Sequence, residues 1–302
     1  MVIIYTVCYN TPHYIEYQYK LFKKFIADDF EYIVFNNTMT NKTLTKDNYK
    51  NNELLINVCK KYNITTFNLN VDNFKNIPDN DASMRAGTAI DASHKILFSK
   101  YSNDNIYFLI DSDAFILSPF NVENFMEHKK FSGRLQCRNN NNNDDDDVIN
   151  YITNHIVIYK PSCLDDSFQE NFSFMPCKIG NANCDCGGKI SNILNKINKH
   201  DFVNWKNSLF SDKGHIEQIY GGSPSKDDDF DYNFLHTLDR NIKQFILDDT
   251  NKLQKKHPFC EIFSNDDNNV TFLHLRAGTN WIGYNFESRE ILLKQFIDLL
   301  LE

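Results

Sequence analysis

The 302-residue sequence lacks any apolar stretch close to the roughly 20 residues that a membrane-spanning helix needs. It also lacks an excess of positive charge, because 32 Lys and Arg residues stand against 40 Asp and Glu residues and give a net charge of −8. A nucleic-acid backbone is therefore not an expected partner. The N-terminus has no basic segment ahead of a long apolar run, so we expect no signal peptide and a cytoplasmic location.

The sequence is also poor in residues that separate domains. It contains 10 Gly and 7 Pro, with no linker rich in them and no internal repeat, so we expect one domain over residues 1–302. Its eight cysteines are scattered. Cys177, Cys184 and Cys186 lie closest together, but C-x6-C-x-C is not a zinc-ribbon or zinc-finger spacing, so free thiols are the simpler expectation.

Apolar segments alternate between strand-like and helix-like patterns over the first 120 residues. Strands are predicted over 2–10, 30–37, 65–70 and 105–117, and helices over 15–26, 52–62 and 82–101. Alternation at this spacing indicates a parallel sheet with helices on both faces. The expected fold class is therefore α/β, with a Rossmann-like, mostly parallel central sheet.

The second part of the chain has a less regular pattern. Strands are predicted over 131–138 and 151–161 and at the start of 270–281, and helices over 187–200 and 288–302. We therefore expect an irregular α+β half to follow the alternating half.

The apolar segment FLIDSDAFIL, residues 108–117, carries two carboxylates, Asp111 and Asp113. In a strand, residues i and i+2 project to the same side, so both carboxylates would face one point. A divalent cation there would offset their charge, and oxygen ligands suit Mg²⁺ or Mn²⁺. Ligands of parallel sheets bind beyond the carboxyl ends of the strands, so we expect the functional edge at this position.

One class of phosphatase also places a D-x-D motif after a strand, with the first Asp as nucleophile. These haloacid-dehalogenase-type enzymes need Thr or Val two residues after the second Asp, where this sequence has Phe115. They also carry the motif after the first strand of the core, whereas here it follows the fourth. The phosphatase interpretation is therefore disfavoured.

From Val2 to about Trp281 the sequence resembles the GT-A class of glycosyltransferases. VIIYTVCYN resembles the nucleotide-binding first strand of that class, SMRAGTAIDASHKIL the helix before the metal motif, and LIDSDAFIL the D-x-D motif itself. HLRAGTNW, residues 274–281, is similar to the closing His and Gly-containing loop. It departs from the H-x-x-G-x-x-K-P-W form of glycogenin-like and lipopolysaccharide galactosyltransferase-like enzymes, since its His-to-Gly gap is one residue longer and Lys-Pro is missing.

The resemblance implies a metal site and a donor site. Asp111, Asp113 and His274 would hold Mn²⁺ or Mg²⁺ against the diphosphate of a nucleotide sugar, most simply a UDP-sugar, and Asp111 would act through the metal or the donor ribose. Further donor contacts are expected from Thr6, Cys8, Tyr9, Asn36 or its neighbour Asn37, Arg85, Ser112, Gly278, Asn280 and Trp281. Arg85 has a plain alternative as a surface arginine of its helix.

A general base near the acceptor hydroxyl is expected if the reaction inverts configuration. Asp185, in N-C-D-C-G-G, resembles the acceptor-side D-x-G segment of several GT-A families, and the Gly pair would let backbone approach a sugar closely. Glu217 is the second candidate base, with Asp229 as a rival. Stacking faces for sugar rings are expected among Trp205, Tyr220 and Trp281, and core packing is the alternative for each.

Together these features predict a metal-dependent glycosyltransferase of the hexosyltransferase or N-acetylhexosaminyltransferase type, acting on a glycan or protein hydroxyl. Residues 1–120 would bind the donor, and residues 121–302 would bind the acceptor and supply a closing metal and phosphate loop. A sugar-phosphate nucleotidyltransferase stays open, although such enzymes usually have a Gly-rich loop where this chain has YNTPHY. A non-catalytic carbohydrate-binding or scaffold protein also stays open, although it would not need a metal site.

Overall fold

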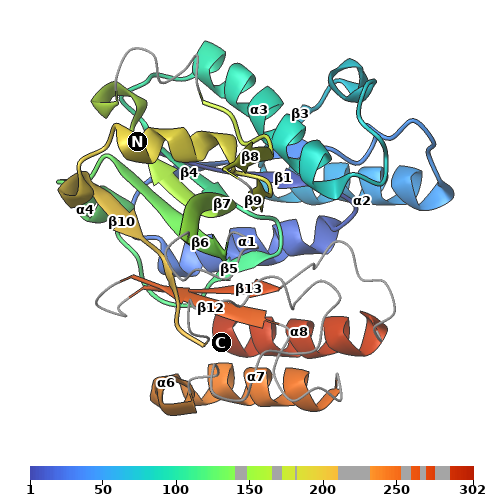
Figure 1. The fold of residues 1–302 in the computed structure, drawn as a ribbon. Coiled ribbons are helices and arrows are strands. Elements are labelled where there is room, and N and C mark those ends of the chain that lie inside the picture. The colour runs from blue at the N-terminus through green and yellow to red at the C-terminus, as the bar shows by residue number, and fades with distance from the viewer. Residues whose placement is uncertain are drawn as a thin grey trace.

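The computed structural model describes most of the chain, in eight stretches. These are residues 1–139, 148–164, 172–180, 182–209, 232–252, 260–265, 270–275 and 286–302. Figure 1 shows the two larger β-sheets with helix α1 between them and further helices around them.

Seven strands of the described chain form the larger sheet, in the order β10-β6-β7-β4-β1-β2-β3. They are β1 (Val2–Cys8), β2 (Phe30–Asn36), β3 (Thr65–Asn68), β4 (Ile106–Ile110), β6 (Phe131–Asn139), β7 (Val148–Tyr159) and β10 (Phe202–Asn204). β1 is parallel to β2 and β4, and β2 is parallel to β3. β7 runs antiparallel to β4 and β6. The α/β class with a mostly parallel central sheet is therefore confirmed.

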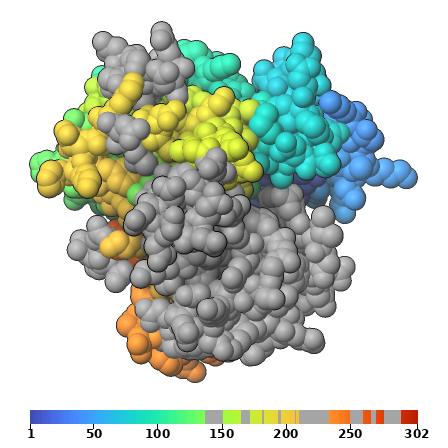
Figure 2. Space-filling view, in the orientation of Figure 1, coloured from blue at the N-terminus to red at the C-terminus, as the bar shows by residue number. Residues whose placement is uncertain are grey.

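Helices cover both faces of this sheet. The three helices are α1 (Pro12–Phe25), α2 (Lys46–Tyr62) and α3 (Ala82–Lys100). Successive strand residues point to opposite faces, so Val2 and Ile4 of β1 pack with α1 and α2, while Ile3 and Tyr5 pack with α3. Figure 2 shows α2 in blue beside α3 in cyan at one end of the visible face. No helix of the described stretches is long and apolar enough to cross a membrane.

Helix α2 begins at Lys46, earlier than the predicted residue 52, because its first turn is capped. The Thr45 hydroxyl accepts a hydrogen bond from the Asn48 backbone N–H at 3.3 Å, and the Asn48 side chain accepts one from the Thr45 backbone N–H at 2.9 Å. This reciprocal pair satisfies backbone donors that a helix start otherwise leaves open.

Three strands of the second half and β5 form a smaller antiparallel sheet in the order β11-β12-β13-β5. Its strands are β11 (Lys206–Asn207), β12 (Cys260–Ser264), β13 (Thr271–Leu275) and β5 (Ala114–Ile116). Helices α6 (Tyr232–Thr237), α7 (Arg240–Lys252) and α8 (Phe286–Leu301) are drawn below this sheet in Figure 1, and α8 also contacts α1. β12, α6 and α7 were not predicted from the sequence.

The single strand predicted over 105–117 is wrong, because this segment forms two strands in two different sheets. β4 ends at Ile110 and β5 begins at Ala114. Between them the chain turns, with the Ala114 N–H donating to the Asp111 carbonyl at 3.0 Å. The buried Gln18 side chain of α1 fixes this turn by donating to the carbonyls of Asp111 at 2.7 Å and Ala114 at 2.8 Å. The two predicted aspartates therefore lie where the chain passes from one sheet to the other.

The helix predicted over 187–200 is also wrong, since this segment forms two short 3₁₀ helices. They are η3 (Lys189–Asn195) and η4 (Lys199–Asp201). Asn and Ser have low helix propensity and favour turns, which explains the break-up of this Asn-rich segment. The remaining short elements are η1 (Val71–Phe74), α4 (Val122–Phe125), η2 (Pro161–Cys163), β8 (Cys177–Ile179) and β9 (Ala182–Cys184).

A buried histidine links α3 to the central sheet. His94 is 2% exposed, its Nε2 hydrogen-bonds with the Tyr5 hydroxyl, and that hydroxyl lies 3.1 Å from the hydroxyl of Tyr159. The rings of Phe98 and Phe172 pack against the imidazole. Burial holds the pKa of His94 well below its ordinary value, so the ring stays neutral in the folded protein.

The His94 environment predicts a loss of stability at mildly acidic pH. Below about pH 6.5 the unfolded chain binds a proton at this histidine that the folded chain excludes, so folding weakens as the pH falls. The unfolding free energy of the parent, measured by urea denaturation from pH 7.5 to 5, should fall more steeply than that of His94→Gln. The difference should approach about 1 kcal/mol per pH unit. His128→Gln, at an exposed site, should follow the parent. Equal slopes for the parent and His94→Gln would contradict the assignment.

Candidate active site

A cavity of about 450 Å³ lies at the carboxyl ends of β1 and β4. Side chains from both halves of the chain line it. They include Tyr9, Asn37, Asp79, Ser83 and Arg85 from the first half, Asp111, Ser112 and Asp113 from the turn after β4, and Asn154, His155, Asp185, Cys186 and His274 from the second half. The sequence predicts a ligand at the carboxyl ends of the parallel strands, and the cavity lies at these strand ends.

Three of these side chains form a group that could hold a metal ion. Asp111, His155 and His274 each present a possible ligand atom, and these atoms all lie within 4.8 Å of one another. The fold brings them together from three elements. The Asp111 N–H donates to the His155 carbonyl of β7 at 2.9 Å, and His274 of β13 is the register partner of Ala114 on β5.

Asp113 joins this group through His274. Its Oδ1 lies 3.5 Å from His274 Nε2, and both side chains are only 6% exposed. The other ring nitrogen of His274, Nδ1, lies 2.9 Å from Oε2 of Glu261, its register partner on β12. A carboxylate at Nδ1 favours the tautomer with the proton on Nδ1, which leaves Nε2 directed at Asp113.

The buried carboxylates and imidazoles of this group shift one another's pKa values. Burial and, to a smaller extent, the neighbouring Asp113 carboxylate raise the pKa of the Asp111 carboxyl to about 7, although His274 and hydrogen bonds from Ser112 and Asn154 oppose the shift. Burial lowers the pKa of His274, but the neighbouring carboxylates of Glu261, Asp113 and Asp111 outweigh that effect and raise it overall. Three carboxylates close to two imidazoles are a donor set that fits a divalent cation.

The two aspartates reach the cavity by a different route from the predicted one. They belong to a turn, where the same-side rule for strand residues does not apply. Asp111 hydrogen-bonds through Oδ1 with the Ser112 N–H at 3.0 Å and through Oδ2 with the Asn154 amide at 2.9 Å. Ser112, predicted as a donor contact, is 2% exposed and also lines the cavity.

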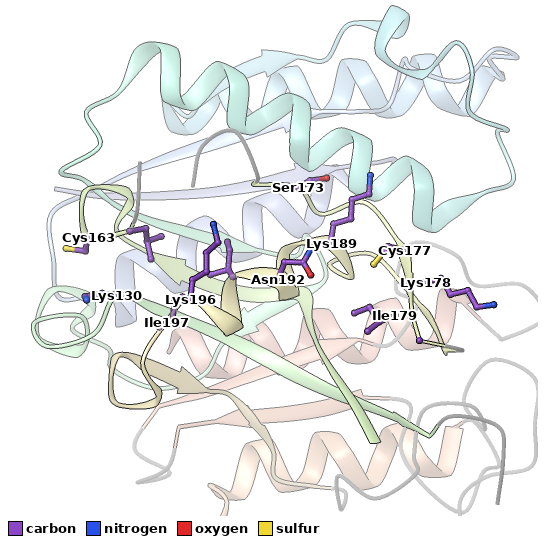
Figure 3. A pocket seen from close by; sticks show the side chains of 13 residues that line it. Lys130, Cys163, Ser173, Cys177, Lys178, Ile179, Lys189, Asn192, Lys196 and Ile197 are labelled. Atoms are coloured by element: carbon purple, nitrogen blue, oxygen red, sulfur yellow. The ribbon is translucent and has the colours of Figure 1, made fainter. Parts of the chain in front are cut away.

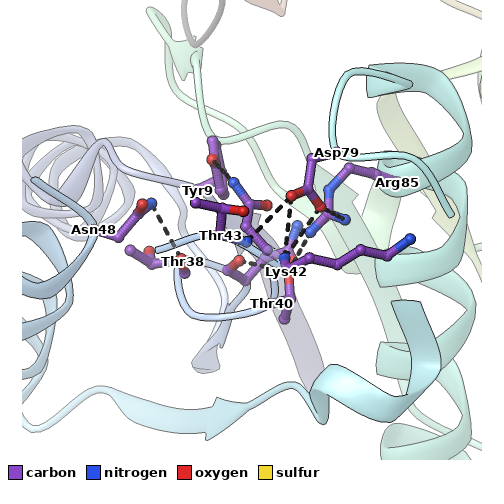
Figure 4. Close-up of polar contacts among 10 residues, drawn as sticks. Tyr9, Thr38, Thr40, Lys42, Thr43, Asn48, Asp79 and Arg85 are labelled. Atoms are coloured by element: carbon purple, nitrogen blue, oxygen red, sulfur yellow. Dashed lines mark hydrogen bonds and ion pairs between the residues drawn. The ribbon is translucent and has the colours of Figure 1, made fainter. Parts of the chain in front are cut away.

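Arg85 lies in the cavity wall with its guanidinium already engaged. Nη1 donates to Asp79 Oδ1 at 3.1 Å, Nη2 donates to Thr40 Oγ1 at 2.8 Å, and the group lies 5.0 Å from the ring centre of Phe74. Asp79 also accepts hydrogen bonds from the backbone N–H groups of 42–43 (Figure 4). Arg85 is 6% exposed, so it is not the plain surface arginine of the alternative interpretation, and it ties the loop after β2 to the start of α3.

Strand β1 contributes only part of the predicted donor pocket. Tyr9 lines the cavity, and its hydroxyl accepts a hydrogen bond from the Asn41 amide at 2.6 Å. Cys8 is fully buried in the core on the α1 and α2 side, where burial raises the pKa of its thiol to about 12. Thr6, two residues before it, is also fully buried and does not line the cavity. Val7 does, because alternate strand residues face opposite sides of the sheet.

The end of β2 shows the same alternation. The Asn36 amide is buried and donates to the side chains of Asn52 at 2.7 Å and Asn68 at 2.9 Å, away from the cavity lining. Asn37, the predicted alternative, lines the cavity, and its side chain accepts a hydrogen bond from the Thr40 hydroxyl at 2.6 Å.

Asp185, the predicted base, lines the same cavity as the aspartate pair. The Gly pair after it packs closely against the same chain. Gly187 has a φ of 98°, and a Cβ there would lie 2.0 Å from the Ile152 carbonyl oxygen, so the backbone closes on β7 of its own chain. A Cβ at Gly188 would also come within 3.0 Å of a neighbouring side chain. The glycines fit this backbone contact and thereby hold Asp185 in the cavity wall.

The remaining predicted residues fall into two groups. Glu217, Gly278, Asn280 and Trp281, with the rivals Asp229 and Tyr220, lie outside the described residues. Trp205 is fully buried, and its indole N–H donates to the Ser132 hydroxyl at 2.7 Å. Trp205 is therefore a core residue, as its alternative interpretation had it.

Among the polar residues that sequence reasoning missed at this site are Asp79, Asn154 and His155, together with Glu261 behind His274. The signal for two of them is the polar stretch Thr153-Asn154-His155, which separates two groups of apolar residues in β7. Nothing in the sequence says that β7 pairs antiparallel beside β4, and this pairing is what places Asn154 and His155 against Asp111.

A second hollow, of about 960 Å³, lies apart from this cavity. Lys130, Lys178, Lys189 and Lys196 are among the side chains that line it (Figure 3). Lys130 Nζ pairs with Asp201 at 2.9 Å. None of the residues predicted for the site lines this second hollow.

Comparison with known proteins gives weak likenesses to glycosyltransferases. No protein-family model and no curated protein matches the chain. Among solved structures, the galactosyltransferase LgtC in complex with donor and acceptor sugar analogues aligns with a TM-score of 0.34 and 12% identity, over 57% of this chain and 60% of that one. The mannosyltransferase Ktr4p from S. cerevisiae aligns with a TM-score of 0.28 and 16% identity, over 46% and 40%. The chain thus spans about three fifths of LgtC. Any assignment of function has to be argued from the residues that line the cavity.

The raised pKa of Asp111 predicts a carboxylate that weakens the fold. Above pH 7 this group is ionised in the folded chain at a cost that the unfolded chain does not bear, whereas below about pH 4 both states hold the proton. Asp111→Asn should therefore be more stable than the parent at pH 8 in the presence of chelator, by on the order of 2 kcal/mol. The difference should shrink towards pH 4.5. Urea denaturation measures both values.

A substitution at an exposed carboxylate provides the control. Asp104→Asn should match the parent at both pH values, since Asp104 is exposed in the turn before β4. An Asp111→Asn variant that is less stable than the parent at pH 8 would show that the carboxylate is compensated in the metal-free protein.

Proposed function

We propose that this chain is a metal-dependent glycosyltransferase that moves a sugar from a nucleotide sugar, most simply a UDP-sugar, to a hydroxyl of a glycan or protein. The observation that carries the proposal is the position of a group that could hold a metal ion, made of the Asp111 carboxylate and the imidazoles of His155 and His274, with Asp113 beside His274. It lies in a cavity at the carboxyl ends of β1 and β4, where parallel sheets bind nucleotides. The weak likenesses to LgtC and Ktr4p point the same way and carry no weight of their own.

In this proposal Asp111, Asp113 and His274 hold the cation. A bound divalent cation would act as a Lewis acid towards the diphosphate whose negative charge grows as the glycosidic bond breaks. Asp111 and Asp113 supply oxygen ligands from the turn that joins the two sheets. His274 supplies a nitrogen whose direction is set by Glu261 at 2.9 Å.

The first half of the cavity fits the donor. Tyr9 and Asn37 provide an aromatic ring and an amide at the ends of β1 and β2, where a base and ribose would lie. Arg85, held by Asp79 and Thr40, keeps the loop after β2 in place beside the donor half of the cavity. Residues 1–120 would form the donor half and residues 121–302 the acceptor half.

Asp185 is the proposed base on the acceptor side, for a reaction that inverts configuration. The acceptor oxygen would form its bond to the anomeric carbon as the bond to the diphosphate breaks, and the hydroxyl proton would pass to the Asp185 carboxylate. Its position in the wall of the same cavity supports this role. Glu217 stays a second proposed base.

The first test is metal-dependent nucleotide binding, measured by thermal unfolding. UDP with Mn²⁺ should raise the melting temperature of the parent by about 5 °C at roughly 100-fold saturation, and chelator should abolish the shift. A response to GDP in place of UDP would keep the enzyme class and change the donor. No response to any nucleotide sugar, together with retained binding of glycans, would indicate the binding-protein alternative and contradict the proposal.

The matched variant is Asp113→Asn. Asp113 is 4% exposed and contacts His274, so the substitution should remove the shift with UDP and Mn²⁺ while the unliganded protein keeps its near-UV circular dichroism. Asp104→Asn should respond as the parent does. An Asp113→Asn variant with the full metal-dependent shift would contradict the metal assignment.

A further inference from the structure

His155 occupies a place in the cavity that the three proposed ligands do not explain. It projects from β7, which runs beside β4, and one of its possible ligand atoms lies within 4.8 Å of those of Asp111 and His274. Its ring centre lies 4.0 Å from that of His274, with the planes tilted by 32°. Two imidazoles at this separation would repel each other strongly if both were protonated.

Neighbouring side chains hold the His155 ring in this position. Its Nδ1 lies 3.2 Å from the Thr153 hydroxyl, and its ring stacks on Phe263 at 5.6 Å with an angle of 12° between the planes. Phe263 also stacks on His274, at 5.7 Å and 23°. The two imidazoles are therefore kept side by side by one aromatic ring of β12.

The carboxylates around the two imidazole rings give this part of the cavity a negative charge that a cation would offset. With neutral imidazoles, Asp111, Asp113 and Glu261 place three negative charges around them. Of the described residues that line the cavity, Arg85 is the one with a permanently positive side chain, and it pairs with Asp79 at 3.1 Å. A divalent cation between the carboxylates and the imidazoles would offset two of the three charges.

We propose that His155 ligates the same ion as His274 and the aspartates, and that this second imidazole makes the site select Mn²⁺ and later first-row transition ions over Mg²⁺. Mg²⁺ prefers oxygen ligands and retains its water, whereas imidazole nitrogen binds first-row transition ions more tightly along the series from Mn²⁺. This inference rests on the proposed function for the existence of the ion, but it concerns ligands that are present before any nucleotide binds.

Mn²⁺ itself is the probe, measured on the full chain by electron paramagnetic resonance, alone and with UDP. The loss of the free-ion signal gives the affinity, and pulsed measurements count the nitrogen atoms bound to the ion. The parent should bind one Mn²⁺ through two imidazole nitrogens, and Mg²⁺ at 100-fold excess should not displace it. His155→Gln should leave one bound nitrogen and weaken the affinity at least about 10-fold. His128→Gln, at an exposed site, should match the parent.

The outcomes separate this inference from the proposed function. One bound nitrogen in the parent, ready displacement by Mg²⁺, or no Mn²⁺ binding in either condition would overturn the inference, and the parent measurements stand even if His155→Gln fails to fold. Two bound nitrogens with no response to any nucleotide would support the inference and remove the proposed function. If His155→Ala still binds Mn²⁺ through two nitrogens, the inference that His155 is a ligand is also wrong.

Discussion

A buried glutamine holds together the part of the molecule on which the site depends. Gln18 of α1 is fully buried, donates to the carbonyls on either side of the aspartate turn, and accepts a hydrogen bond from the Tyr32 hydroxyl at 2.6 Å. A turn in the interior needs partners for its backbone carbonyls, because an unpaired buried polar group destabilises the fold. One amide side chain therefore fixes the point at which the chain leaves the larger sheet and enters the smaller one.

That crossing point explains why the site combines residues from distant parts of the sequence. β4 brings Asp111 beside His155 of β7, and β5 brings the same turn beside His274 of β13. The larger sheet thus supplies one imidazole and the smaller sheet the other. The charge that collects at this junction would be costly to bury without a cation, and the raised pKa of Asp111 reports that cost.

Most of the larger sheet was predictable because each strand or helix is indicated by the residues of its own segment. Strands and helices of the first half follow from alternation of apolar patterns, and strand ends follow from the polar residues behind them. The errors have local causes as well. One strand is predicted over 105–117 because the residues on both sides of the turn are apolar. One helix is predicted over 187–200 although several of its residues have low helix propensity.

The aspartate pair was singled out because carboxylates on an apolar segment are costly to bury, and His274 and Asp185 because of the resemblance to GT-A enzymes; the structure places all four in the lining of one cavity. Thr6, Cys8 and Asn36 were placed one residue away from the side chains that line the cavity. Which of two consecutive strand residues faces a ligand depends on which face of the sheet the ligand occupies. In a sheet that is buried on both faces the strand residues are apolar on both, so the sequence pattern does not identify the face that binds the ligand.

The α/β class, the order of the elements in the first half and the position of two carboxylates at the carboxyl ends of the strands follow from the amino-acid sequence. These depend on periodicity and on residues close together in the chain. Tertiary structure alone decided that His155 lies beside Asp111, that Glu261 orients His274, and that Arg85 is engaged by Asp79 and Thr40. The first contact depends on the pairing of β4 with β7, the second on the pairing of β12 with β13, and the third on the packing of α3 against the loop after β2. All three are set by packing of the whole molecule.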